Sequence, residues 1–285
     1  MLYVVNYADG EPYDSFRKIN TRSAYCFGKA DKVLEYSLKD IPQDYKDAHK
    51  DIFAYERGAG LWLWKPFLIN QALSELKYGD WMFYTDAGAV FIRDIHKLID
   101  CAKAYNTDIM LFEQPLLHRQ FTKRETMVRM GLEDNEANQT LGILLLQKTD
   151  RTILLMKEWL QLCEQEDLLS PNTFYPEIDE YENFVAHRED QSILSALRIK
   201  YGIAPFRDPS DYGEMPFQYA TCDKFIYRPM DYANSTYPTI LLCSRRTPPY
   251  EYLLLYVVKR ILCKLNIRWT EEAFLRKFNS KLIKQ

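Results

Sequence analysis

The feature that most limits the fold of this chain is a repeated alternation of short apolar runs with amphipathic stretches. Residues 66 to 79 begin at a proline, place apolar side chains at helical spacing and end at a glycine, which predicts a helix. The apolar run WMFYT follows at 81 to 85, and a helix at about 95 to 105 precedes a second run, DIMLFEQ, at 108 to 114. Strands that alternate with helices of this length predict an α/β fold with a mostly parallel sheet flanked by helices on both faces.

The same pattern extends along the chain in both directions. It predicts further strands at 2 to 8, 32 to 37 and 141 to 147, and further helices at 13 to 27, 151 to 165 and 190 to 202. We expect residues 1 to 250 to form one domain and residues 251 to 285 to form a basic helical extension.

Charge is distributed unevenly between these two parts. Residues 251 to 285 contain eight Lys/Arg and three acidic residues, a net charge of +5, so that the rest of the chain carries −8 of the total of −3. A basic tail indicates an anionic partner such as a membrane surface. The acidic body disfavours nucleic-acid binding.

The tail also has a helical apolar pattern. Apolar residues at 253, 254, 257, 258, 261, 262 and 265 share one side of a helix, while Lys259, Arg260, Lys264 and Arg268 lie on or beside the other. This pattern is typical of a helix lying on an anionic membrane, and packing against the preceding domain explains it equally well. No uninterrupted apolar stretch approaches the roughly 20 residues that span a bilayer.

The cysteines and the N-terminus indicate a cytosolic protein. The six cysteines lie far apart, with no Cys-x-x-Cys pair and no Cys/His cluster, which disfavours zinc and favours a reducing compartment. The first apolar run is followed closely by acidic residues and resembles a first strand more than a signal peptide.

Two stretches place chemically useful side chains near predicted helix or strand ends. ERGAGLWLWKPF, at 56 to 67, sets Arg57 and Lys65 among small and aromatic residues. In YTDAG, the buried strand ends on Asp86, and ligands of parallel sheets bind beyond the carboxyl ends of strands. Asp86 is suited to a divalent cation or a ribose hydroxyl, and Gly88 to close approach of a ligand. A turn or helix cap at Asp86 is an equal alternative.

The third stretch, HREDQS, begins the helix predicted at 190 to 202. Its side chains are those of His187, Arg188, Glu189, Asp190 and Gln191. Such a run is ordinarily a solvated face, and helix N-termini also collect anions and phosphates.

Together, the segments GLWLWKP, MFYTDAG and HREDQSILSAL resemble GT-A-fold glycosyltransferases of bacterial capsule and lipopolysaccharide biosynthesis, over roughly residues 1 to 245. The resemblance implies a nucleotide-sugar donor, a glycan or lipid-linked acceptor, and a location in the cytoplasm or on the inner face of the plasma membrane. It also implies a divalent cation, Mn²⁺ or Mg²⁺, held by an Asp-x-Asp motif. Asp86-Ala87-Gly88 matches the first aspartate of that motif, and Gly88 replaces the second.

EDQSIL is similar to the Asp-Gln-Asp stretch of retaining enzymes of the glycogenin and lipooligosaccharide galactosyltransferase type. The similarity places Asp190 and Gln191 beside the anomeric carbon and favours retention, with Ser192 in place of the third residue. Those enzymes have a metal-binding histidine near the C-terminus. The last histidine of this chain is His187, which is the candidate substitute.

Sugar transfer explains these residue types. Cleavage of the bond to a nucleoside diphosphate builds positive charge on the sugar and negative charge on the diphosphate, so both need partners. Asp190 and Gln191 are the candidate catalytic residues. The candidate donor-binding residues are Arg57, Lys65, Asp86, Ala87, Gly88 and Arg245, with Arg246 beside the last.

Other classes of protein remain as alternatives. A nucleotidyltransferase that makes sugar nucleotides shares this general fold, but no Gly-rich, basic signature follows the first strand. A non-catalytic binding protein stays open because fold does not fix function. A dehydrogenase is disfavoured because Gly-x-Gly-x-x-Gly is absent after the first strand.

Overall fold

The computed structural model describes residues 1 to 244 and 247 to 265. Its larger sheet contains β1 (Leu2–Tyr7), β2 (Lys32–Tyr36), β3 (Trp81–Tyr84), β5 (Ile109–Leu117), β6 (Asn138–Gln147) and β7 (Pro205–Arg207). A second sheet pairs β4 (Ala89–Phe91) with β8 (Leu241–Cys243). The longer helices are α1 (Tyr13–Cys26), α5 (Trp64–Glu75), α6 (His96–Ala104), α8 (Asp150–Cys163), α10 (Glu189–Lys200) and α12 (Pro249–Lys264). Shorter ones are α2 (Gln43–Ala48), α3 (Lys50–Phe53), α4 (Gly58–Leu61), α7 (Arg124–Arg129), α9 (Glu166–Leu169) and α11 (Asp211–Glu214).

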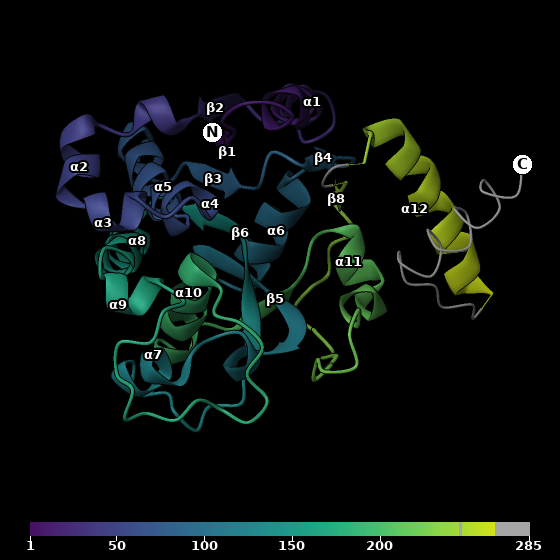
Figure 1. Ribbon diagram of the computed structural model, residues 1–285. Helices are drawn as coiled ribbons and strands as arrows, with labels where there is room; N and C mark the ends of the chain where they lie inside the picture. The colour runs from purple at the N-terminus through teal and green to yellow at the C-terminus, as the bar shows by residue number, and fades with distance from the viewer. Residues whose placement is uncertain (245–246, 266–285) are drawn as a thin grey trace, which may run out of the picture.

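The larger sheet has the strand order β2-β1-β3-β6-β5-β7 (Figure 1). The β1–β2, β1–β3 and β5–β7 pairs are parallel, whereas β6 runs antiparallel to both of its neighbours. The predicted α/β class with a mostly parallel sheet is therefore confirmed. The direction of β6 is a finding that the apolar run at 141 to 147 did not reveal, because an apolar run looks the same in either direction.

Side chains of the central strands alternate between two cores. Met82 and Tyr84 face the core under α5, α8 and α10, while Trp81 and Phe83 face the core that α6 closes on the other side. This period of two explains why β3 is apolar at every position. Both faces are covered, so the ends of the strands are the places where polar groups can gather.

The predicted helices form close to their expected bounds. α5 begins at Trp64, two residues before Pro66, which occupies the first turn where a missing N–H does no harm. α10 ends at Lys200, and Gly202 follows with φ +59°, a conformation that favours glycine.

α12 packs against α11 and the loop after it, at the side of the molecule remote from α2 and α3 (Figure 1). Its buried residues are Tyr252, Tyr256 and Lys259, and the Lys259 Nζ donates to Gln218 Oε1 at 2.7 Å. Most of the apolar stripe predicted from sequence is exposed instead, while Val258 and Leu262 are half-buried. The helix therefore packs against the domain, as the alternative expected, but two tyrosines and a lysine with hydrogen-bond partners form most of the docked face in place of the stripe.

Candidate functional site

Three of the predicted residues meet at the carboxyl end of β3. Lys65, from the first turn of α5, places its Nζ 3.1 Å from Asp190 Oδ2 in the first turn of α10. Lys65 is 5% exposed and Asp190 3% exposed. Asp86 is exposed two residues after β3, where its Oδ1 accepts a hydrogen bond from the Tyr84 hydroxyl at 3.2 Å. The structure thus brings one ammonium and two carboxylates to a single strand end.

The charges of this cluster set its protonation. Burial alone lowers the pKa of Lys65, but the negative charges of Asp190 and Asp86 outweigh burial, so its pKa is raised and the ammonium is kept. Burial raises the pKa of Asp190, and Lys65 offsets only part of that rise. Burial and the two nearby carboxylates raise the pKa of Tyr84 far above its usual value, so the phenol stays a hydrogen-bond donor.

Several buried polar atoms around this strand end have no hydrogen-bond partner within the described part of the chain. They are the Tyr7 hydroxyl, the Thr85 hydroxyl and Asp190 Oδ2, whose contact with Lys65 Nζ has the distance of an ion pair without hydrogen-bond geometry. Tyr7 ends β1 and Thr85 follows β3, its direct neighbour in the sheet. Native structures rarely leave buried polar groups unsatisfied, so two unpaired hydroxyls beside a carboxylate oxygen whose partner is the Lys65 ammonium indicate a site for a polar molecule at this sheet edge.

Aromatic rings and a glycine shape the space around Lys65. Tyr7 stacks on Trp64 with 3.6 Å between ring centroids, and Lys65 Nζ lies 5.8 Å from the centroids of Trp64 and Tyr84. A Cβ at Gly142 of β6 would lie 3.1 Å from Lys65 Nζ. Sequence reasoning missed Tyr7 and Gly142, although a glycine inside an apolar strand is itself a signal of close approach.

The chain between Arg57 and Lys65 has an unusual backbone. Five consecutive residues, 58 to 62, have positive φ, and three of them, Ala59, Leu61 and Trp62, are not glycine. This left-handed turn costs roughly 1–2 kcal/mol for each L-residue with a Cβ. Gly58 and Gly60 cannot be replaced freely, since a Cβ there would lie 2.4 Å from the Trp62 ring and 2.7 Å from the Phe53 ring.

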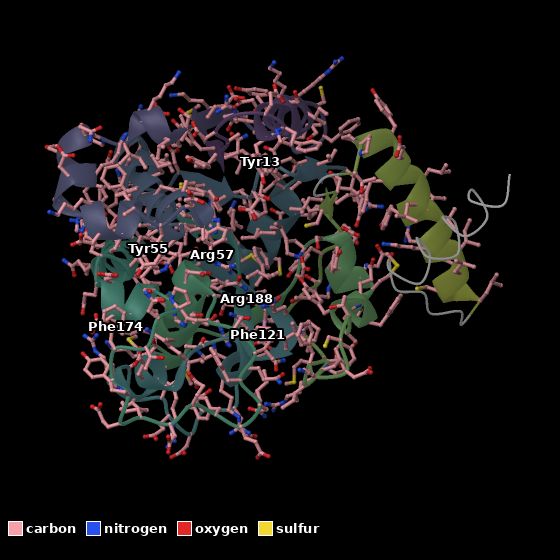
Figure 2. The ribbon with its side chains drawn as sticks, in the orientation of Figure 1. Tyr13, Tyr55, Arg57, Phe121, Phe174 and Arg188 are labelled. Atoms are coloured by element: carbon pink, nitrogen blue, oxygen red, sulfur yellow. The ribbon has the colours of Figure 1, made fainter. Side chains whose placement is uncertain are left out.

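A second strained residue pairs with this turn. Glu189 has φ +36°, and its Oε1 accepts from Arg57 Nε at 2.6 Å. Burial raises the pKa of Glu189, and Arg57 opposes that rise. Figure 2 shows Arg57 and Arg188 on the same face of the molecule. The guanidinium carbon of Arg188 lies 4.3 Å from the ring centroid of Phe121. Glu189 directly precedes Asp190, so the strained turn and the strained Glu189 lie beside the Lys65 cluster. Strained residues of this kind cluster at functional sites.

Gln191 and His187 lie in different surroundings. The Gln191 side-chain amide donates to the Thr140 carbonyl of β6 at 2.7 Å, which fixes Gln191 beside the sheet. His187 is buried, accepts from the Lys123 backbone N–H at 3.3 Å and faces the backbone of Leu168. Burial, together with the charge of Lys123, lowers the pKa of His187 to about 3, so its ring is neutral. The polar contacts of His187 are thus with the backbone of neighbouring segments.

The turn after β3 is held by the segment that follows β8. Ala87 is buried, and the Gly88 carbonyl accepts from Ser244 Oγ at 2.9 Å. Ser244 therefore ties the chain directly after β8 to the turn that carries Asp86. Arg245 and Arg246 lie outside the described residues.

The described residues contain no group of three His, Cys, Asp or Glu side chains that could hold a metal ion. Asp86 offers one carboxylate, and Gly88 has no side chain where the Asp-x-Asp motif has its second. One exposed carboxylate beside a glycine does not make the donor set of a resident Mn²⁺ or Mg²⁺ ion.

Comparison with known proteins gives fold likenesses only. No family model matches the sequence, and a search of curated proteins finds no match. Among solved structures, the apo form of mouse xyloside xylosyltransferase 1 is similar over 87% of this chain and 99% of its own, with 10% identity and a TM-score of 0.45. The galactosyltransferase LgtC in complex with donor and acceptor sugar analogs is similar over 90% of this chain and 95% of its own, with 15% identity and a TM-score of 0.45. The glycosyltransferase GlyE of Streptococcus pneumoniae TIGR4 is similar over 95% of this chain and 66% of its own, with 13% identity and a TM-score of 0.40.

Proposed function

We propose that this protein is a GT-A-type glycosyltransferase that moves a sugar from a nucleotide-sugar donor to a glycan or lipid-linked acceptor. The observation that carries the proposal is the buried Lys65–Asp190 ion pair beside unsatisfied polar groups at the carboxyl end of the sheet. A polar ligand with hydroxyl groups satisfies such atoms, and a buried carboxylate suits a sugar that develops positive charge.

The proposed reaction assigns work to this chain's own residues. The bond between the anomeric carbon and the diphosphate oxygen breaks, and its electron pair stays with the diphosphate. An acceptor hydroxyl oxygen bonds to the anomeric carbon, and its proton passes to the departing diphosphate. Asp190, held by Lys65, stabilises the positive sugar, and Gln191 orients it.

The donor's phosphates and ribose are assigned to the opposite side of the same site. Arg57 is 59% exposed on its side chain and is free to exchange Glu189 for a phosphate, and Asp86 is exposed to meet a ribose hydroxyl. We assign Ala87 and Gly88 to the backbone surface under the donor, with Arg245 following Ser244. Retention of configuration is proposed from the similarity of the Asp190-Gln191 stretch.

A donor screen tests this function. Release of the free nucleotide, UDP, GDP or CMP, from a panel of UDP-, GDP- and CMP-sugars, with and without Mn²⁺, should show turnover of at least one donor. A donor that binds the native state also raises the melting temperature. A binding protein would give a thermal shift without turnover, and a nucleotidyltransferase would respond to a sugar phosphate with a nucleoside triphosphate. Either result would replace the proposed function.

We further propose that α12 attaches the enzyme to an anionic membrane at the inner face of the plasma membrane, for surface polysaccharide synthesis. Because α12 docks through Tyr252 and Tyr256, it leaves a row of large apolar side chains exposed, among them Leu254 at 67% and Ile261 at 54%. Exposed apolar patches mark interaction surfaces, and the net charge of +5 over residues 251 to 285 complements anionic lipid. No helix among the described residues is long and apolar enough to span a bilayer.

Sedimentation with liposomes containing phosphatidylglycerol tests this attachment. The double variant Leu254→Glu/Ile261→Glu should stay in the supernatant, whereas Leu154→Glu, at 66% exposure on the remote helix α8, should sediment like the wild type. Equal sedimentation of all three proteins would show that the stripe does not bind lipid.

A further inference from the structure

A cavity of about 500 Å³ lies at the β7 edge of the larger sheet. Its lining includes Asn138 of β6, Arg198 of α10 and the segment 230 to 234, and it contains none of Arg57, Lys65, Asp86 or Asp190. It is therefore a separate space from the candidate active site. The volume lies within the range of small-molecule sites.

The floor of this cavity is a buried and ordered polar network. Arg198 Nη2 lies 3.1 Å from Glu113 Oε2, and the Tyr232 hydroxyl donates to Glu113 Oε1 at 2.9 Å. Arg198 also donates to the Asn138 carbonyl at 2.7 Å. Each of Glu113, Arg198 and Asn138 is at most 5% exposed. Such a network holds its members in fixed positions, which is a condition for a specific binding site.

One acceptor in this network lacks a donor. The Asn138 amide nitrogen donates to the Arg228 carbonyl at 2.9 Å, but its side-chain oxygen is buried without a hydrogen-bond partner among the described residues. An unsatisfied buried acceptor is destabilising, so the cavity floor holds a polar group whose hydrogen-bonding capacity is not used within the described residues.

The lining has three acidic and two basic side chains, and their charges balance once Arg119, the partner of Glu136, is counted, which favours a neutral ligand. Glu113 is paired with Arg198, and Glu136 with Arg119 at 3.1 Å. Of the other charged lining residues, Asp231 and Arg228 have opposite signs and make no ion pair within the described residues. Donors and acceptors thus stand together beside the apolar surfaces of Pro205, Met230 and Ala233. A pyranose matches this mixture, because its hydroxyls both donate and accept while its C–H face is apolar.

The cavity is mechanically connected to the candidate active site. The Thr140 carbonyl accepts from Gln191, and the Thr140 hydroxyl accepts from Arg198 Nε at 2.8 Å. Asp190 and Arg198 lie on the same helix, eight residues apart, which corresponds to about 12 Å along the axis. That span is compatible with two or three sugar units.

We propose that this cavity binds a neutral sugar unit of a glycan, remote from the site of transfer. Naming that glycan as the acceptor rests on the proposed function, whereas the binding of a neutral saccharide does not. The subsite would let the enzyme choose among acceptors by a unit that does not react.

Saturation-transfer NMR with lactose, maltose and N,N′-diacetylchitobiose tests the proposal without any donor. We expect saturation transfer from the wild type to at least one disaccharide and at least a tenfold weaker transfer from Ala233→Trp, whose indole fills the cavity from an exposed position. Ala220→Trp, at an exposed alanine outside the lining, and Asp190→Asn should bind like the wild type.

Three results would overturn the inference. They are no saturation transfer to any of the disaccharides, transfer that Ala233→Trp leaves intact, or transfer that Asp190→Asn abolishes, since the sugar would then lie in the candidate active site. Glucose 6-phosphate binding more tightly than glucose in an Ala233-dependent manner would also reject a neutral ligand. Failure of donor turnover with saccharide binding intact would reject the proposed function and leave this subsite standing.

Discussion

Removal of the Lys65 ammonium is the change whose consequences follow most directly from the structure. In Lys65→Met, the Asp190 carboxylate loses the partner 3.1 Å away and stays almost fully buried. Breaking a buried ion pair by deleting one partner costs about 3–5 kcal/mol, because a buried charge is left uncompensated. We expect a loss of that size in the free energy of unfolding at pH 8, measured by urea denaturation followed by tryptophan fluorescence.

The loss should also depend on pH. Burial already raises the pKa of Asp190 above that of an unfolded aspartate, about 3.9, and loss of Lys65 raises it further. The folded variant then binds a proton more readily than the unfolded chain does, so its stability falls as pH rises through that window. The deficit relative to the wild type should therefore shrink between pH 8 and pH 5.

Two further variants separate the ion pair from general damage. Lys200→Met removes the exposed partner of Glu158 in a surface pair at 2.9 Å that joins α10 to α8, and should cost at most about 1 kcal/mol. Lys65→Met/Asp190→Leu should recover most of the lost stability while remaining inactive. A loss below about 1 kcal/mol in Lys65→Met, or one that does not change with pH, would show that this pair is neither buried nor coupled.

Three other changes test separate features of the molecule. Ala59→Gly should stabilise the protein by up to about 1 kcal/mol in urea denaturation, because glycine relieves the strain at φ +50°. Gly60→Ala should destabilise the protein. An Ala59→Gly variant that is less stable than the wild type would contradict the left-handed turn. Asp86→Asn should lower donor turnover by roughly 10²-fold with an unchanged urea midpoint, since Asp86 is exposed; full activity would remove it from the site. Burial raises the pKa of Asp211 to about 6, so the folded protein holds this proton more tightly than the unfolded chain does. Ionisation of Asp211 should therefore lower the free energy of unfolding by about 3 kcal/mol as pH rises from about 4 to 7, and Asp211→Asn should remove this part of the pH dependence.

The sequence predicted most of the sheet and the elements that carry the site, because apolar runs and helix ends are local signals. It could not predict the direction of β6, since direction depends on which neighbours a strand finds. The left-handed turn was equally hidden. Gly58 and Gly60 permit positive φ, but Ala59, Leu61 and Trp62 adopt it only because the surrounding structure holds them.

The sequence predicted only part of the candidate site, because local patterns do not contain long-range contacts. Lys65, Asp86 and Asp190 were assigned to one site through the resemblance to GT-A glycosyltransferases, and the structure brings them together at one strand end. The pairing of Glu189 with Arg57 depends on contacts 132 residues apart, which no local pattern contains. In α12, the local apolar pattern predicts the wrong buried face, because its more apolar side is not the side that packs on the domain.

The proposed action of Asp190 on the sugar of a nucleotide-sugar donor is tested most directly by one comparison. For the donor that the wild type turns over, kcat and the Kd of the matching nucleoside diphosphate are measured in the wild type and in Asp190→Asn. We predict a fall in kcat of at least about 10²-fold with a Kd changed by less than about threefold, because the lost interaction belongs to the transition state of the sugar. An unchanged kcat, or equal losses in kcat and nucleotide affinity, would contradict this role of Asp190.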